Sequence, residues 1–150
     1  MLKELSKAPG FELKDQDGKT HKLSDYAGRK VVLFFYPKNF TPGCTKEVCS
    51  FRDSYELLKK KGVVLLGVSA DSVESHKKFR EKYSLPFPLL SDPEKKVIKV
   101  YGSLKEKSMF GNTFLGVQRS TFIIDEKGNL QKVFPEVNVS GHVAEVLDEL

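Results

Sequence analysis

The apolar positions of this chain follow two different spacings, and each spacing predicts a different kind of element. Residues 31–36 (VVLFFY) and 63–69 (VVLLGVS) are almost continuously apolar, which is typical of strands buried on both faces of a largely parallel sheet. Between them we expect one helix, which begins near Cys44 and ends at Gly62. Its apolar face is made of Phe51, Tyr55, Leu57 and Leu58. The order strand, helix, strand predicts a parallel crossover.

The N-terminal thirty residues have the pattern of a hairpin. Residues 11–13 and 19–23 alternate apolar with polar side chains, and the turn-forming segment 15–18 (DQDG) lies between them. Residues 24–29 then predict a short helical turn that ends at Gly28. This N-terminal β-hairpin is therefore followed by a helical turn that leads into the central strand.

The second half of the chain alternates helical and strand patterns. We expect helices at 72–83, 93–101 and 141–150 and strands at 86–90, 119–125 and 130–134. Asp92 should cap the second of these helices, with Pro93 at its first position. The last two strands predict a hairpin, and the polar, aromatic segment 102–117 between the elements predicts a long functional or mobile loop. The pattern as a whole predicts a single α/β domain, residues 1–150, with a thioredoxin-like arrangement.

Length and composition narrow the class of protein. A chain of 150 residues can bury a core without disulfides, and two cysteines are too few for a secreted disulfide scaffold. No apolar run approaches the ~20 residues of a membrane span. The first residues lack the apolar core and cleavage site of a signal peptide. We therefore expect a cytoplasmic protein with no membrane association.

The net charge of +5 raises the question of nucleic-acid binding. The basic clusters at 59–61, 77–78 and 95–96 lie in amphipathic helical patterns beside acidic residues and without interleaved aromatic residues. Such clusters are typical of a solvated surface, so we expect no nucleic-acid partner. A positive surface would still attract an acidic reductase.

The strongest chemical signal follows the first buried strand. Pro37 ends that strand, and the residues from Thr41 to Cys44 (TPGC) lead into the helix, which places Cys44 in the first helical turn. A helix N-terminus favours the thiolate over the thiol, and cysteines in such positions react with peroxides. Thr41 can offer its hydroxyl to the sulfur or to an incoming oxygen, and Gly43 allows the backbone to approach closely.

The second cysteine, Cys49, lies five positions after Cys44. On an intact helix the two are separated by about 7.5 Å along the axis and about 140° in direction. A disulfide does not close across Cα atoms more than about 7 Å apart without backbone movement. Either the two cysteines never bond and Cys49 is a packing residue, or the first turn unwinds and Cys49 attacks an oxidised Cys44. Two cysteines and the scattered His21, His76 and His142 do not suggest a zinc site.

Two overlapping segments carry a family resemblance. Residues 37–44 (PKNFTPGC) resemble the PxxxTxxC signature of the peroxiredoxins, and residues 41–49 (TPGCTKEVC) look like the TPGCTxExC form of the PrxQ, or bacterioferritin comigratory protein, subfamily. The resemblance extends over nearly the whole chain, although relatives usually carry an acidic residue where Gly10 stands. It implies a thioredoxin-like fold with a central mixed β-sheet flanked by helices.

The resemblance also implies roles for individual residues. Cys44 would be the peroxidatic cysteine, Cys49 the resolving cysteine, Thr41 the hydroxyl that orients peroxide, and Pro37 a shield for the substrate pocket, which Gly43 and Glu47 would also border. None of the three histidines is assigned a catalytic role.

Two charged residues have both a structural and a functional interpretation. From the residues alone, Arg119 is either a partner in a structural salt bridge or an exposed strand end, and Glu47 is an acidic residue in a first helical turn. The resemblance implies instead that Arg119 stabilises the Cys44 thiolate and the departing oxygen, and that Glu47 bonds backbone or arginine.

The implied activity is that of a thiol peroxidase that needs no metal, haem or flavin. Cys44 would become a sulfenic acid, Cys49 would form an intramolecular disulfide with it, and thioredoxin or a similar dithiol would reduce that disulfide. The subfamily resemblance implies a monomer. Two alternatives remain open, a non-enzymatic redox sensor or holdase and a thioredoxin-like disulfide reductase, although the C-x-x-C motif of the latter is missing. Phe40, Phe110 and Phe114 are candidates either for an apolar entrance or for core packing.

Overall fold

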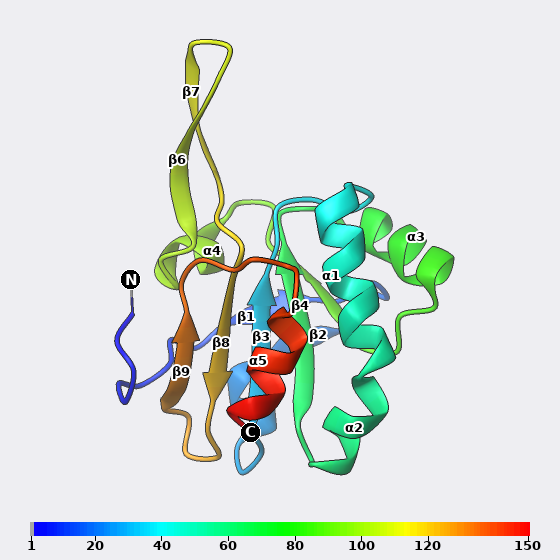
Figure 1. The fold of residues 1–150 in the computed structure, drawn as a ribbon, viewed down its shortest axis with the longest axis vertical. Helices are drawn as coiled ribbons and strands as arrows, with labels where there is room; N and C mark the ends of the chain where they lie inside the picture. The colour runs from blue at the N-terminus through cyan, green and yellow to red at the C-terminus, as the bar shows by residue number, and fades with distance from the viewer. Residues whose placement is uncertain (1) are drawn as a thin grey trace.

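A seven-stranded mixed β-sheet runs through the computed structural model, which describes residues 2–150 (Figure 1). Its strands are β1 (Glu12–Lys14), β2 (Thr20–Lys22), β3 (Val31–Phe35), β4 (Val64–Ser69), β5 (Leu89–Ser91), β8 (Ser120–Ile124) and β9 (Leu130–Phe134). They lie in the order β2-β1-β5-β4-β3-β8-β9. The pairs β3–β4 and β4–β5 are parallel, whereas the other pairs are antiparallel. The predicted mixed sheet, parallel crossover and two hairpins are therefore confirmed.

Helices cover both faces of this sheet. The helical elements are η1 (Leu23–Tyr26), α1 (Pro42–Asp53), α2 (Tyr55–Lys60), α3 (Val73–Tyr83), α4 (Lys96–Val100) and α5 (His142–Asp148). One core lies under α1, α2, α3 and α5, and the other lies under α4, η1 and the N-terminal segment. Figure 1 shows α1 and α5 in front of the sheet. Within residues 2–150, no helix has both the length and the apolar character needed to cross a bilayer.

The central strand β3 contributes to both cores because successive side chains of a strand point to opposite faces. Val32 and Phe34 face the core that contains α1, and Val31, Leu33 and Phe35 face the other. Phe34 stacks on Phe51 of α1 with ring centroids 4.6 Å apart. A Cβ at Gly67 of the neighbouring β4 would lie 2.8 Å from the Phe34 ring, so this glycine makes room for the stack. The packing holds α1 against the sheet immediately after the carboxyl end of β3.

The segment 102–117 is a second small sheet and not the predicted loop. It contains β6 (Leu104–Met109) and β7 (Asn112–Val117), which pair as an antiparallel hairpin that projects from the body of the molecule (Figure 1). Its two-residue turn is Phe110-Gly111, with positive φ values of 53° and 81°. A tight hairpin turn of this type usually carries Asn-Gly or Asp-Gly. Because Phe-Gly stands here instead, the sequence pattern did not indicate a hairpin.

Three of the aromatic residues considered as core candidates are exposed. Phe110 is 96% exposed, Phe40 47% and Phe114 46%, so core packing was the wrong interpretation for each. Phe110 and Phe114 lie at the turn and on one strand of the projecting hairpin, where the body of the protein does not cover them. Only Phe40 lies in the loop that leads to Cys44.

Two helix boundaries also differ from the prediction. The helix expected from Cys44 to Gly62 divides at Ser54 into α1 and α2, and this turns Leu57 away from the core, 47% exposed. The helix expected from Pro93 begins only at Lys96, because Lys95 has a left-handed backbone with φ 60°. Lys95 and not Asp92 is the N-cap residue, yet the Asp92 carboxylate accepts a hydrogen bond at 2.9 Å from the amide of Ile98 in the first turn and so still caps this N-terminus.

Candidate active site

Cys44 lies in the first turn of α1, at the carboxyl end of β3, as predicted. Thr41 is the N-cap residue, with extended backbone angles of φ −87° and ψ 149°, and Pro42 is the first helical residue. The first intrahelical hydrogen bond runs from the Thr45 amide to the Thr41 carbonyl at 2.9 Å. The amides of Gly43 and Cys44 precede that bond and have no backbone acceptor within residues 2–150, so they can stabilise negative charge. The Cys44 side chain is buried, with 1% of its surface exposed.

Arg119 reaches this turn from the other end of the sequence. It immediately precedes β8, which pairs with β3, so its guanidinium lies beside the start of α1. Arg119 Nη2 is 3.4 Å from Cys44 Sγ, and Nη1 donates to Glu47 Oε1 at 2.8 Å. Burial alone would lower the pKa of Arg119, but Glu47 and Cys44 raise it above its ordinary value. The guanidinium therefore remains a cation in contact with the sulfur.

Glu47 lies one helical turn after Cys44 and is almost completely buried, with 1% of its side chain exposed. Burial raises its pKa to about 7, although Arg119 opposes this shift. Within residues 2–150 its second oxygen, Oε2, has no hydrogen-bond partner. The ion pair therefore contains a carboxyl group that changes charge near neutral pH. Its protonation decides how much of the arginine charge remains for the sulfur.

The residues around Cys44 differ in how directly they approach it. The Thr41 hydroxyl donates to the Lys38 carbonyl at 2.7 Å, so its oxygen is left as an acceptor at the helix mouth. A Cβ at Gly43 would lie 3.2 Å from Arg119 Nη2, so the missing side chain makes room for the guanidinium. Pro37 is half-buried and follows Tyr36, the first residue after the central strand. The structure thus brings Gly43, Glu47 and Arg119 together beside Cys44, and it places Thr41 at the N-cap of the same helix.

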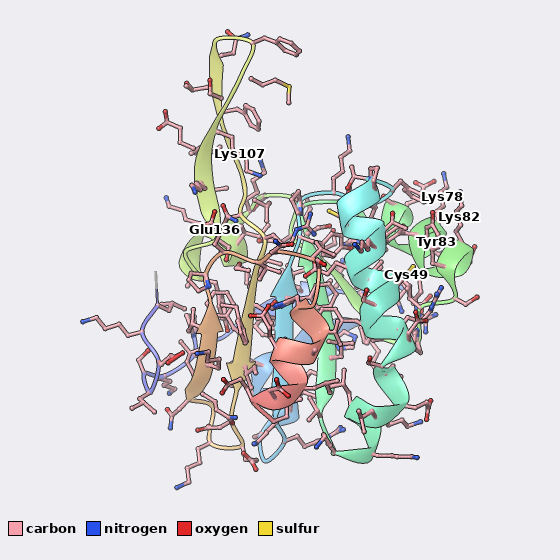
Figure 2. The ribbon with its side chains drawn as sticks, viewed as in Figure 1. Cys49, Lys78, Lys82, Tyr83, Lys107 and Glu136 are labelled. Atoms are coloured by element: carbon pink, nitrogen blue, oxygen red, sulfur yellow. The ribbon has the colours of Figure 1, made fainter. Side chains whose placement is uncertain are left out.

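Cys49 lies on the same unbroken helix, α1, about 140° around the helix axis from Cys44. It is half-buried against the core residues between α1 and α3, and Figure 2 shows it near Tyr83. Burial raises the pKa of the Cys49 thiol. Arg52, one turn later, donates to the Tyr83 carbonyl at 2.8 Å and connects α1 to the end of α3. Both cysteines are free thiols in this arrangement.

Two further polar groups lie near the site, Lys107, whose hairpin was taken for a loop, and His142, whose helix was predicted but which was given no role in the site. Lys107 lies on β6, and its Nζ donates to the Val117 carbonyl at 2.8 Å (Figure 2). Burial and then the Arg119 charge lower the pKa of Lys107, whereas the Cys44 sulfur raises it. His142 at the start of α5 lies 2.7 Å from the Thr121 hydroxyl of β8, and burial lowers its pKa. The hairpin pattern of β6–β7 is the signal that would have placed Lys107.

The arrangement suits two-electron chemistry at sulfur. A buried cysteine faces a fixed cation and free amides, which are the groups that stabilise a thiolate and an oxyanion. Among residues 2–150, no group of three or more His, Cys, Asp or Glu side chains is placed to hold a metal ion.

Comparison with known proteins identifies the chain's relatives. The AhpC/TSA family matches residues 5–133. A protein named putative peroxiredoxin bcp from Coxiella burnetii is 51% identical over 144 residues, which cover 96% of this chain and 95% of the relative. Peroxiredoxin Bcp from Bacillus subtilis is also 51% identical over 144 residues, covering 96% of this chain and 92% of that protein.

Solved structures are similar over nearly the whole chain. A cysteine-to-serine variant of PrxQ from Xylella fastidiosa has a TM-score of 0.90 at 32% identity and covers 99% of this chain and 96% of its own. The bacterioferritin comigratory protein of Xanthomonas campestris, described with trapped intermediates and for its alkyl peroxide reduction activity, has a TM-score of 0.88 at 38% identity, covering 92% and 88%. The fold is therefore that of the thioredoxin-like peroxiredoxins, as predicted.

Proposed function

Because the chain belongs to the AhpC/TSA family, among the peroxiredoxins of the PrxQ type, we propose that it reduces hydrogen peroxide and organic hydroperoxides through Cys44 and Cys49. The contact of 3.4 Å between Arg119 Nη2 and Cys44 Sγ is the observation that carries this proposal. It places a permanent cation at the sulfur of a helix-mouth cysteine, where an anionic nucleophile and an oxyanion leaving group both need one. The alkyl peroxide reduction activity of the X. campestris relative supports the same substrate class.

In the first step, the Cys44 thiolate attacks one oxygen of the O–O bond. An S–O bond forms, the O–O bond breaks, and the sulfur is oxidised to a sulfenic acid while the peroxide is reduced. The leaving alkoxide or hydroxide takes up a proton from solvent and departs as alcohol or water. Arg119 and the free amides of the first turn stabilise its charge. The Thr41 oxygen, whose own hydrogen is donated to Lys38, accepts the hydrogen of the peroxide hydroxyl and orients it.

In the second step, Cys49 resolves the sulfenic acid. The Cys49 sulfur attacks the Cys44 sulfur, an S–S bond forms, the S–O bond breaks, and the hydroxyl leaves as water. Both cysteines lie on one continuous helix, five positions apart, so part of α1 unwinds before the bond closes. A dithiol such as thioredoxin then reduces the disulfide by exchange and returns both thiols. The protein performs this cycle as a monomer.

The test is a coupled assay with thioredoxin, thioredoxin reductase and NADPH, run with hydrogen peroxide, tert-butyl hydroperoxide and cumene hydroperoxide. Wild-type protein should consume NADPH with peroxide, and Cys44→Ser should reduce consumption to the background rate. Cys49→Ser should still reduce one equivalent of peroxide but should not cycle. Substantial turnover by Cys44→Ser would contradict the assignment of the nucleophile.

The same assay separates the two alternatives. Stoichiometric oxidation without cycling, with any dithiol supplied, would favour a redox sensor. Insulin reduction without peroxide consumption would favour a thioredoxin-like disulfide reductase. A Cys44–Cys49 disulfide in the oxidised protein, identified by mass spectrometry, is expected only for the proposed peroxidase cycle and for a sensor that uses the same pair.

A further inference from the structure

A buried polar network lies beneath the loop that leads to Cys44. Asn39, in the middle of that loop, is 3% exposed, and each end of its amide is bonded. Its Oδ1 accepts from the Tyr36 hydroxyl at 2.6 Å. Its Nδ2 lies 2.9 Å from His76 Nδ1 and donates to the Ser75 hydroxyl at 3.1 Å. The network thus joins the catalytic loop to α3.

The neighbours of His76 determine where its proton lies. His76 is completely buried on α3, and its Nε2 is 3.0 Å from the Leu90 carbonyl of β5. A carbonyl only accepts, so Nε2 carries the hydrogen and Nδ1 presents its lone pair to the Asn39 amide. Burial lowers the pKa of His76, against the opposing charge of Asp71, and keeps the ring neutral. The hydroxyls of Tyr36 and Ser69 also face the ring, each at 3.5 Å.

The position of the loop depends on few anchors. The Asn39 side chain is one anchor, and the backbone N–H of Asn39, which donates to Asp71 Oδ2 at 2.9 Å, is another. The next residue, Phe40, has a positive φ of 65°, which is strained for an aromatic residue and persists only where the surroundings hold it. Thr41 follows and begins α1. Arg119 immediately precedes β8, a separate element, so its distance to Cys44 depends on how well this loop is held.

We propose that His76 is a positioning residue for the reaction at Cys44, and that it acts by accepting a hydrogen bond from the Asn39 amide. This inference rests on the proposed function, because it concerns the geometry of the same site. The ring spans the gap between the catalytic loop and β5, with one nitrogen bonded to each. Loss of the Nδ1 acceptor removes the bond between the Asn39 side chain and the ring and leaves that side chain held by the hydroxyls of Tyr36 and Ser75.

Two substitutions separate the two nitrogens of the ring. His76→Asn places an amide oxygen near the Nδ1 position and keeps the acceptor for Asn39, while it loses the donor to Leu90. His76→Gln places an amide nitrogen near the Nε2 position and keeps the donor, while it loses the acceptor. We expect His76→Gln to lower the second-order rate constant of Cys44 with hydrogen peroxide on the order of tenfold or more, since small misplacements of reacting groups are costly. His76→Asn should stay within about threefold of wild type on the same scale.

Single-turnover stopped-flow measurements, with the unfolding temperature recorded for each variant, test this expectation. Equal rates for His76→Gln and wild type, or equal slowing of both variants at equal unfolding temperature, would overturn the proposal. Asn39→Leu, which also loses the bonds to Tyr36 and Ser75, should slow the reaction at least as much as His76→Gln, and the double variant should be no slower than Asn39→Leu. Additive losses would show that the two residues act independently and would also overturn it.

Two measurements keep the inference distinguishable from the peroxidase proposal and from a folding defect. The rate at which iodoacetamide alkylates Cys44 reports the same loop geometry. His76→Gln should therefore be alkylated more slowly than His76→Asn and wild type even if the wild type reduces no peroxide. In wild-type protein, nitrogen NMR of His76 should show the Nε2–H tautomer. The Nδ1–H tautomer would exclude Nδ1 as acceptor and end the proposal without any substitution.

Discussion

Arg119 Nη2 lies 3.4 Å from Cys44 Sγ although 75 positions separate the two residues in the chain. The antiparallel pairing of β8 with β3 creates this contact, since Arg119 precedes β8 and the Cys44 turn follows β3. The same guanidinium binds Glu47 at 2.8 Å, so one planar group serves the nucleophile and a buried carboxyl together. This geometry leads to the predictions below.

Replacement of Arg119 by leucine should lower the rate constant of Cys44 with peroxide by about two orders of magnitude, as for loss of one oxyanion donor. Because the variant would leave Glu47 buried without its cation, it is best made together with Glu47→Gln. Arg119→Lys keeps the charge but not the two-pronged geometry, and we expect an intermediate rate. Stopped-flow kinetics of wild type, of Arg119→Leu with Glu47→Gln, and of Arg119→Lys measure these rates. A leucine variant that reacts as fast as wild type would contradict the expectation.

Glu47 should make the folded state less stable as pH rises from 5 to 8. Its pKa of about 7 in the fold exceeds the ordinary value of 4.5, so between these values the folded state binds more protons than the unfolded state. The free energy of unfolding then falls as pH rises, by up to about 3 kcal/mol for a shift of this size.

Chemical denaturation of Cys44→Ser and of Cys44→Ser with Glu47→Gln, at pH 5 and at pH 8, measures this effect without a Cys44 thiol, and Cys49 is common to both proteins. The glutamine variant should gain stability relative to its parent as pH rises. A constant difference between the two proteins would show that Glu47 does not titrate in this range.

Gly43→Ala should stabilise the protein yet slow its reaction with peroxide. Alanine favours helix over glycine by about 1 kcal/mol, and the φ of Gly43 is not in the left-handed range. The added Cβ would lie 3.2 Å from Arg119 Nη2 and displace the guanidinium from the sulfur. In the Arg119→Leu, Glu47→Gln background the same change should have no effect on the rate. Equal slowing in both backgrounds would argue that the alanine acts through the helix and not through Arg119.

Oxidation should release the amides of α1 to exchange. In reduced protein the helix is continuous from Pro42 to Asp53. If Cys49 resolves Cys44, deuterium uptake after one equivalent of peroxide should rise in the first half of α1, while α3 and β4 keep their protection. Cys49→Ser provides the control, because its sulfenic acid has no internal partner and the helix should remain closed. Identical uptake in oxidised and reduced wild type would exclude unwinding.

Signals that are local in the chain identified most of the sheet. Five consecutive apolar residues in β3 and an apolar run in β4 identify strands without knowledge of their neighbours. The turn from Thr41 to Cys44 likewise contains its own helix start. Where the local signal was unusual, the prediction was wrong: Phe110-Gly111 makes a tight turn with an aromatic residue in a left-handed backbone, and so the β6–β7 hairpin was taken for a loop.

The sequence by itself determined which cysteine lies at a helix mouth and which strands are central, because these depend on residues adjacent in the chain. Only the tertiary structure decided how close Arg119 comes to Cys44, that burial brings the Glu47 carboxyl into the neutral pH range, and that His76 meets Asn39 beneath the loop. Those relationships join residues on different elements. They depend on strand order and on exclusion of water, which no short stretch of residues encodes.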